Sequence, residues 1–245
     1  MKIKPDDKKI RSFTKKYWRE GRKVLYLNSR KVVDLIGKVP IDQIKGRAAN
    51  MLDSVELRDY LIGIWSTTGS YFARDMSSNL MSRAQKETDL WEEAYIRYMA
   101  ERVKDKAVSI ARTEATLINS VIDIIIQDGF REGYSIDQMT GTIQRELEKR
   151  LRVVHDWEAE RIARTEVIGA ANKGSYDGAL STGLDVKKAW LTSGLKGVRG
   201  SHQMYEGMGF VPMSHDYNVG LRHPGDPNGS PEEVINCRCT IIYEI

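Results

Sequence analysis

The strongest constraint on the fold is a change of character near residue 183. Before it, apolar residues recur at steps of three and four, the spacing of an amphipathic helix. After it, glycines and prolines are frequent and the apolar segments are short: Ala189–Leu191, Phe210–Val211 and Thr240–Tyr243. Such segments predict short strands joined by loops. We therefore expect an α+β fold, with mostly helical N-terminal two thirds and a small β-containing, loop-rich C-terminal domain.

We predict three consecutive segments along the chain. Residues 1–100 form a basic helical N-terminal region, and residues 101–183 form a helical segment with a repeated motif. Residues 184–245 form the small C-terminal unit. A hydrophobic content of 41% and only two cysteines exclude a wholly disordered chain and a disulfide scaffold.

Within the helical part, the longest helix is expected over residues 86–128. Residues 60–84 contain glycines and a Ser/Thr cluster, so a helix with a break is predicted there. Ser135 followed by Gln138 is a capping-box pattern, which predicts the start of a helix. A further helix is expected to begin near Asp156.

Charge is distributed unevenly. Residues 1–50 carry fifteen Lys and Arg against five Asp and Glu, a net charge of +10. The rest carries twenty-three basic and twenty-nine acidic residues, a net charge of −6. A basic arm on an acidic body indicates an acidic partner such as DNA, although a solvated lysine-rich helix face gives the same pattern. The candidate DNA-binding residues are Lys8, Lys9, Arg11, Lys15, Lys16, Arg19, Arg22 and Lys23.

A five-residue motif occurs twice. Ile110–Glu114 and Ile162–Glu166 both read Ile-Ala-Arg-Thr-Glu. Residues two apart on a helix do not face each other, so Arg164 and Glu166 each need a separate partner. The motif predicts half-buried structural ion pairs, with a catalytic carboxylate as the alternative.

The C-terminal unit holds the candidate metal ligands. If residues 236–243 form a strand, Cys237 and Cys239 lie on the same face. Two thiolates there could bind Zn²⁺, with His202 or His223 completing the site. The C-x-C spacing differs from the usual zinc pair, so packing of both cysteines in the core and a redox role stay open.

Common enzyme motifs are absent from the sequence. There is no P-loop, no H-E-x-x-H, no G-x-S-x-G and no dinucleotide-binding G-x-G-x-x-G. A metal-dependent nuclease built from His202, Asn236 and the cysteines would lack a recognisable general base. We therefore expect a structural or assembly protein and not an enzyme.

No membrane or secretory segment is predicted. The most apolar stretch, Leu117–Ile126, is interrupted by polar residues, whereas a span needs about 20 mostly apolar residues. The first ten residues, MKIKPDDKKI, contain no apolar region. A cytosolic setting, in which the cysteines stay reduced, is expected.

Several motifs follow one another in the second half of the chain: E-R-I-A-R-T-E-V-x-G-A-x-N-x-G (160–174), Trp190, R-G-S-H (199–202) with Gly207, P-G-D-P (224–227) and N-C-R-C (236–239). Taken together, this ordered set resembles the phage Mu F-like minor head proteins, or head morphogenesis proteins, of tailed bacteriophages. The resemblance covers residues 105–245. One departure is Val234-Ile235, where many members have His-Pro before N-C-R-C.

The resemblance implies a minor capsid protein of the phage head. Such a protein would lie in the virion, in the capsid interior near the portal, and in the host cytoplasm during assembly. Its implied partners are the portal protein and the major capsid or scaffolding protein, and double-stranded DNA is a further candidate. The alternative is a DNA-binding protein, a zinc-dependent DNA-processing protein or a toxin-like effector. The structural-motif residues are Arg164, Glu166, Arg199, His202, Asn236 and Arg238. We predict that Arg199 and Arg238 tie loops together through carbonyl or carboxylate groups.

Overall fold

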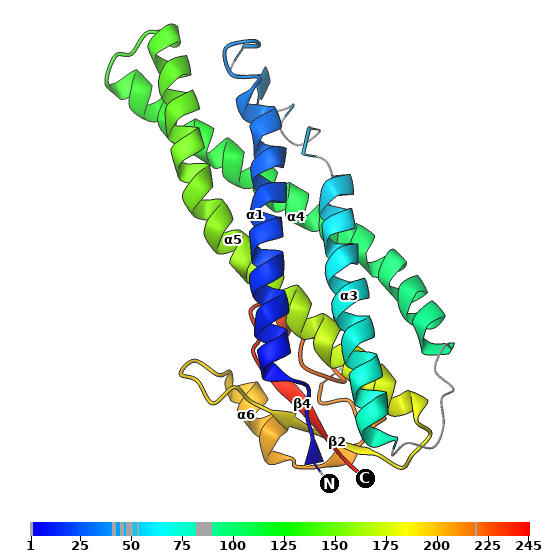
Figure 1. Ribbon diagram of the computed structural model, residues 1–245. Coiled ribbons are helices and arrows are strands. Elements are labelled where there is room, and N and C mark those ends of the chain that lie inside the picture. Colours follow the sequence, from blue (N-terminus) through cyan, green and yellow to red (C-terminus); the bar gives the residue numbers. More distant parts are fainter. Residues whose placement is uncertain are drawn as a thin grey trace. The chain divides into compact units, whose positions relative to one another are not determined.

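The computed structural model (Figure 1) describes residues 2–40, 43–44, 47, 51–52, 54–81, 90–218 and 220–245. The long helices, in chain order, are α1 (Asp7–Val33), α3 (Ser54–Leu80), α4 (Leu90–Arg131) and α5 (Ile136–Ser181). Two short helices follow, α6 (Gly200–Gly207) and α7 (Pro231–Val234). The strands are β1 (Lys2–Ile3), β2 (Lys187–Leu191), β3 (Val211–Pro212) and β4 (Thr240–Glu244).

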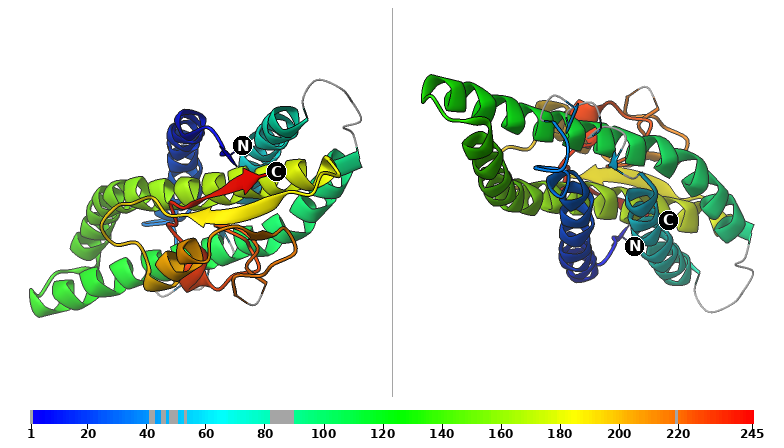
Figure 2. Two further views of the ribbon diagram at one scale, coloured as in Figure 1. Left: turned by 90° about the horizontal axis from the view of Figure 1, so that it is seen from below. Right: turned by 90° about the horizontal axis from the view of Figure 1, so that it is seen from above.

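The α+β prediction is confirmed. Three of the four strands coincide with apolar segments of the C-terminal part, and the sheet order is β1-β4-β2-β3. Every pair is antiparallel, with Ala189 opposite Ile242 and Trp190 opposite Ile241 in the central ladder. Figure 2 shows β2 in yellow and β4 in red lying side by side. The edge strand β1 was not predicted, because two residues carry no periodic signal.

The chain folds into two compact units, each assembled from separate stretches of sequence. Unit 1 comprises residues 1–18, 62–100 and 161–245, and unit 2 comprises residues 19–61 and 101–160. The units are thus defined by packing, whereas the three predicted segments are consecutive. That segment division stays a prediction.

Two helix predictions need correction. Residues 60–80 form one uninterrupted part of α3, so the expected break is absent. The helices predicted after Ser135 and from Asp156 are a single helix, α5, whose 46 residues exceed the 42 of α4. Tertiary packing overrides the weak helix propensity of glycine in such cases.

Close packing of α5 against α3 explains why α3 continues through Gly69 without a break. A Cβ atom at Gly174 of α5 would collide with the carbonyl oxygen of Gly69 in α3. One turn further along, a Cβ at Gly178 would collide with the carbonyl oxygen of Ala73. Small residues on both helices therefore let the two backbones approach closely. The cost in helix propensity is compensated by this contact.

The helix start at Ser135 is confirmed in detail. The backbone N–H of Gln138 donates to Ser135 Oγ at 3.3 Å, and the backbone N–H of Ser135 donates to Gln138 Oε1 at 2.8 Å. This reciprocal pair is the capping box that the sequence predicted. It satisfies two backbone donors at the beginning of α5.

The sheet is covered on one side by α3 and α5. Met76 and Leu80 of α3, Ala179 of α5, and Ile241 and Tyr243 of β4 form one buried cluster. The cluster places the end of α5 against β4, so the C-terminal strand is held by helices from earlier in the chain. No helix among the described residues is long and apolar enough to span a membrane.

The glycine contact between α3 and α5 predicts the effect of a single methyl group. We expect Gly174→Ala to lower the free energy of unfolding by about 1–3 kcal/mol, because the added Cβ forces two helix backbones apart. Urea denaturation followed by circular dichroism measures the change. Gly63→Ala is the matched control, since no other atom lies within 4 Å of a Cβ built at Gly63 of α3. Equal stability of Gly174→Ala and wild type would contradict the steric explanation.

Candidate metal centre

Three buried side chains converge in unit 1. His202 Nδ1 lies 3.3 Å from Cys239 Sγ and 3.7 Å from Cys237 Sγ. All three ligand atoms lie within 4.8 Å of one another, and both cysteines are free thiols. One imidazole nitrogen and two sulfurs at this spacing can hold a soft or borderline metal ion. The structure thus brings together the three predicted ligands.

The cysteines reach this position through a turn and not through a strand, which corrects the sequence-based geometry. β4 begins only at Thr240, after both cysteines. Asn236 has a φ of 60°, a left-handed conformation that Asn tolerates better than most residues. The chain therefore turns sharply after α7, and the N–H of Cys239 points back to Cys237 Sγ at 3.4 Å.

A carboxylate fixes the orientation of the histidine. His202 Nε2 lies 2.7 Å from Glu233 Oε2, and Ser201 Oγ donates to the same oxygen at 3.1 Å. When the Nε2–H donates to Glu233, the lone pair of Nδ1 faces the two sulfurs. Carboxylate–histidine pairs of this kind fix the tautomer of metal-binding histidines. Glu233 was not predicted, because its role depends on the position of α7.

Aromatic rings enclose the cluster. The ring centroid of Trp190 lies 4.9 Å from that of His202, 5.2 Å from Tyr205 and 5.1 Å from Tyr217. Water is thereby kept away from the sulfurs on this side. Trp190, which belongs to the family resemblance, forms the wall of the site.

The two thiols differ in their electrostatics. The hydrogen bond from Cys237 lowers the pKa of Cys239, and the interaction with His202 lowers it further. The same bond and burial raise the pKa of Cys237. The pair therefore favours a thiolate at Cys239 that accepts a hydrogen bond from the thiol of Cys237. A thiolate is the form of cysteine that binds metals.

Asn172 of α5 connects this region to the helical body. Its Nδ2 donates to the carbonyl oxygens of Pro224 and Cys239 at 3.1 and 3.2 Å. Its Oδ1 accepts from Thr240 Oγ1 and from the N–H of Ile241, both at 3.2 Å. The fully buried amide thus uses all of its hydrogen-bonding capacity. It holds the segment just after the cysteines and the P-G-D-P loop against one helix.

The second copy of the repeated motif has separate partners for Arg and Glu, as predicted. Arg164 Nη1 donates to Asn236 Oδ1 at 2.6 Å, and Glu166 Oε2 accepts from Trp65 Nε1 at 2.9 Å. Thr165 Oγ1, from the same motif, accepts the N–H of Asn236 at 2.9 Å. Both of these partners are neutral side chains. The motif anchors the left-handed residue ahead of Cys237.

The first copy of the motif lies in unit 2, and the partner of its Glu differs from that of the Glu in the second copy. Glu114 is fully buried, and its Oε1 lies 3.2 Å from Nε2 of the equally buried His155. Burial raises the pKa of Glu114. A fully buried carboxyl group thus lies beside an imidazole, where the sequence analysis predicted a half-buried ion pair.

The two arginines expected to tie loops behave differently. Arg199 Nη2 donates to the carbonyl oxygen of Ile235 at 2.6 Å, and it thereby holds the end of α7. Arg238 is exposed, and no hydrogen bond or ion pair joins it to another described residue. The prediction that these arginines tie loops together is confirmed for Arg199. It is wrong for Arg238, whose side chain is exposed.

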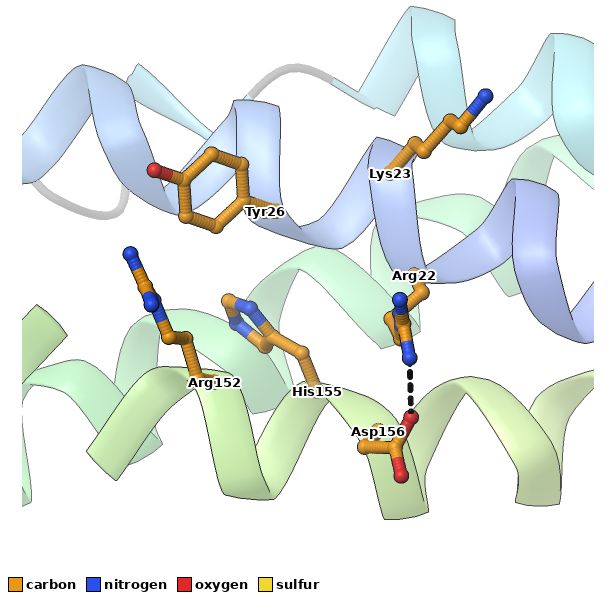
Figure 3. Close-up of a pocket in the computed structure, with 6 residues that line it drawn as sticks. All are labelled: Arg22, Lys23, Tyr26, Arg152, His155 and Asp156. Atoms are coloured by element: carbon orange, nitrogen blue, oxygen red, sulfur yellow. Dashed lines mark hydrogen bonds and ion pairs between the residues drawn. The ribbon is translucent and has the colours of Figure 1, made fainter. Parts of the chain in front are cut away.

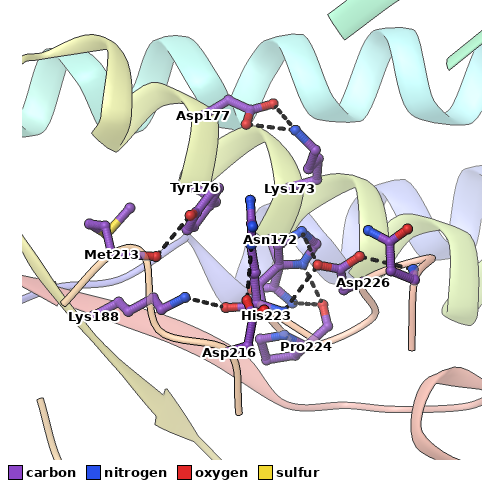
Figure 4. A network of polar contacts seen from close by, with 12 residues as sticks. Asn172, Lys173, Tyr176, Asp177, Lys188, Met213, Asp216, His223, Pro224 and Asp226 are labelled. Carbon is purple, nitrogen blue, oxygen red and sulfur yellow. Dashed lines mark hydrogen bonds and ion pairs between the residues drawn. The ribbon is translucent and has the colours of Figure 1, made fainter. Parts of the chain in front are cut away.

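His223, the alternative metal ligand, is held elsewhere (Figure 4). Its Nδ1 lies 3.3 Å from the carbonyl oxygen of Pro224, and its Nε2 lies 3.5 Å from Asp226 Oδ2. Asp226 also accepts the N–H groups of Arg222 and Asn228 at 3.1 and 3.0 Å. Burial lowers the pKa of His223 to about 4. The P-G-D-P motif is therefore a loop-stabilising element with a neutral histidine.

A buried lysine is part of the same network and was not predicted. Lys188 Nζ donates to the carbonyl oxygens of His215 and Arg222 at 2.7 and 2.8 Å. It also lies 5.0 Å from the ring centroid of Tyr176. Burial lowers the pKa of Lys188 to about 8. In the sequence it is one of two adjacent lysines, and only strand alternation at β2 could have indicated that it points inward.

The candidate DNA-binding residues lie on α1, and most are exposed. Lys8, Arg11, Lys15 and Lys16 are exposed in unit 1, as are Arg19, Arg22 and Lys23 in unit 2. Lys9 is half-buried, with its Nζ 4.8 Å from the ring centroid of Tyr71. Among the exposed cations, Arg22 pairs with Asp156 Oδ1 at 3.0 Å.

Comparison with known proteins gives one partial match. No protein-family model and no solved structure matches the chain. A curated protein of Enterococcus faecalis (strain ATCC 700802 / V583), the NAD(+)–arginine ADP-ribosyltransferase EFV, is 30% identical over 119 residues. The match covers 46% of this chain and 23% of the relative, so the chain spans about a quarter of that protein's length.

This match corrects one expectation. The sequence analysis predicted a structural protein and not an enzyme, on the ground that common catalytic motifs are absent. The similarity is to a protein named as an enzyme, so that prediction is contradicted. Absence of familiar motifs excludes only the reactions that use them. The resemblance to phage head proteins is not tested by this match and stays a prediction.

Proposed function

We propose that the chain is a minor capsid, or head morphogenesis, protein of a tailed bacteriophage, and that its C-terminal unit is organised around a zinc centre. The proposal rests on the hydrogen bonds that join the motifs of the family resemblance to one another. Arg164 bonds Asn236, Asn172 bonds Pro224 and Cys239, and Arg199 bonds Ile235 beside N-C-R-C. Motifs that are distant in the sequence thus belong to one three-dimensional unit.

Unit 1 also presents apolar side chains suited to protein partners. Met204 and Met208 lie four residues apart at α6 and are 65% and 49% exposed. Leu195 and Ile235 are exposed in neighbouring loops of the C-terminal part. Exposed methionines adapt to varied partner surfaces. The proposed partners are the portal protein and the major capsid or scaffolding protein, in the capsid interior near the portal.

Double-stranded DNA is the further proposed partner. The support is the set of exposed Lys and Arg side chains on α1. Phosphate contacts through such residues are independent of base sequence and weaken with salt, which suits a protein beside packaged DNA.

Quantitative mass spectrometry of purified phage particles tests the head role. We expect a few copies per particle in DNA-filled heads and in empty procapsids, because a portal-associated protein is retained after packaging. The major capsid protein and a non-structural phage protein serve as internal standards. Absence of the chain from both particle types would overturn the proposed role.

Zinc is the metal that the ligand set fits. Two sulfurs and one imidazole nitrogen are its usual donors, and a fourth position is left for water or an external group. Glu233 supplies the outer-shell hydrogen bond that such a histidine requires. Folding a small loop-rich unit around a metal would also add to its stability.

Elemental analysis of the purified chain tests the zinc centre. We expect about one zinc per chain, near-complete loss in Cys239→Ser, and retention in His215→Asn, a histidine outside the cluster. Replacement by Co²⁺ should produce a thiolate-to-metal absorption band. Wild-type protein that stays free of zinc and forms no such band would show that the cysteines are packed core residues.

A second candidate function is favoured by the partial match alone. The relative's name describes transfer of ADP-ribose from NAD⁺ to arginine. In that reaction a guanidinium nitrogen replaces nicotinamide on the ribose, and a proton is released. We expect an active chain to release nicotinamide from NAD⁺ in the presence of an arginine-rich acceptor and to add one ADP-ribose to it. No release by the full chain would assign the activity to the part of the relative that this chain lacks.

A further inference from the structure

Unit 2 contains a cavity of about 620 Å³ that the proposed function does not use (Figure 3). Its lining residues are Arg22, Lys23, Tyr26, Arg152, His155 and Asp156. The first three come from α1, and the others come from α5. The volume lies within the range of small-molecule sites, which is about 300–1,000 Å³.

The charges around this cavity are mainly positive. Arg22 Nη1 pairs with Asp156 Oδ1 at 3.0 Å, so these two charges compensate each other. Lys23 and Arg152 are exposed and make no ion pair with any other described residue. In Figure 3 the Arg152 side chain lies near Tyr26, whereas the Lys23 side chain extends away from the other labelled residues. Asp156, the carboxylate in the lining, is paired with Arg22, so the lining has two cations in excess. An anion is the ligand that this arrangement would attract.

His155 gives the cavity a polar group that the protein leaves unsatisfied. The side chain is 1% exposed and projects from α5 towards Tyr26 of α1 in Figure 3. Its Nε2 lies 3.2 Å from Glu114 Oε1, and neither ring nitrogen makes a hydrogen bond of good geometry with the described residues. A buried polar atom without a partner is unfavourable by about 1–3 kcal/mol. A ligand that accepts a hydrogen bond from Nδ1 would remove this cost.

The state of Glu114 is consistent with a hydrogen on Nδ1. Burial raises the pKa of Glu114, which favours its protonated form. A protonated Glu114 lies within reach of Nε2 at 3.2 Å, and when it donates there the imidazole hydrogen lies on Nδ1. This tautomer presents a donor to the cavity.

We propose that this cavity binds a phosphate group, with Arg152 as the first charged donor and His155 as the buried donor. Lys23 becomes the second charged donor when its exposed side chain rotates towards the bound phosphate. A phosphate offers several oxygens to donors from two helices, whereas a carboxylate offers two. The remaining volume accommodates the organic part of a small phosphate ester beside Tyr26. A free nucleotide and a DNA backbone phosphate share this chemistry. The proposal does not depend on the head role of the chain.

Isothermal titration calorimetry with the full chain tests the proposal and separates the two sources. The probes are inorganic phosphate, adenosine monophosphate and a 20-base-pair DNA duplex, each at the same ionic strength. Arg152→Gln and Lys23→Gln remove exposed cations at the cavity and should leave folding intact. Arg145→Gln is the matched control, because Arg145 is exposed on the same helix and does not line the cavity.

We expect adenosine monophosphate to bind, with affinity about tenfold weaker in Arg152→Gln and in Lys23→Gln than in wild type or Arg145→Gln. Loss of duplex binding in the same variants, without binding of either small probe, would support the proposal with DNA as the source. Absence of binding by all three probes would overturn it. Equal affinities of Arg152→Gln and Arg145→Gln for every probe that binds would also overturn it.

Discussion

The side-chain amide of Asn172 is the interaction on which the C-terminal unit depends. It is fully buried in α5 and makes four hydrogen bonds, to Pro224, Cys239, Thr240 and Ile241. Three of the four partners are backbone groups: the carbonyl oxygens of Pro224 and Cys239, which lie outside strands and helices, and the N–H of Ile241 in β4. Since an unsatisfied buried group is unfavourable by about 1–3 kcal/mol, loss of this amide would leave several such groups at once. A loop-rich segment can thus be fixed by one residue of a rigid helix.

The geometry of the candidate metal centre depends on the hydrogen bonds by which Asn172 holds Cys239 and Thr240. Once Cys239 and Thr240 are held, the left-handed Asn236 directs Cys237 back towards Cys239, and α6 supplies His202. Glu233 then selects which imidazole nitrogen faces the sulfurs. The two arginines of this region differ in their contacts. Arg199 donates a hydrogen bond to the carbonyl oxygen of Ile235, whereas Arg238 is exposed.

The repeated Ile-Ala-Arg-Thr-Glu motif shows how one sequence pattern takes two structural roles. In unit 1, Glu166 accepts a hydrogen bond from Trp65 and is satisfied. In unit 2, Glu114 lies beside His155, and neither nitrogen of this imidazole has a hydrogen-bond partner among the described residues. His155 also lines the cavity between α1 and α5. The first environment satisfies its carboxylate within the fold, whereas the second leaves buried polar atoms beside a cavity.

Local periodicity and residue chemistry were enough to predict the fold class, the capping box at Ser135 and the two cysteines of the candidate metal centre, with His202 or His223 as the third candidate ligand. They could not determine that α3 and α5 continue through predicted breaks, that a turn brings Cys237 and Cys239 together, or that Glu233, Lys188 and His155 matter. Those features depend on residues from distant parts of the chain. Close backbone approach at Gly174 and hydrogen bonds across long sequence separations exist only once the helices and loops have packed, so local sequence patterns carry no signal for them.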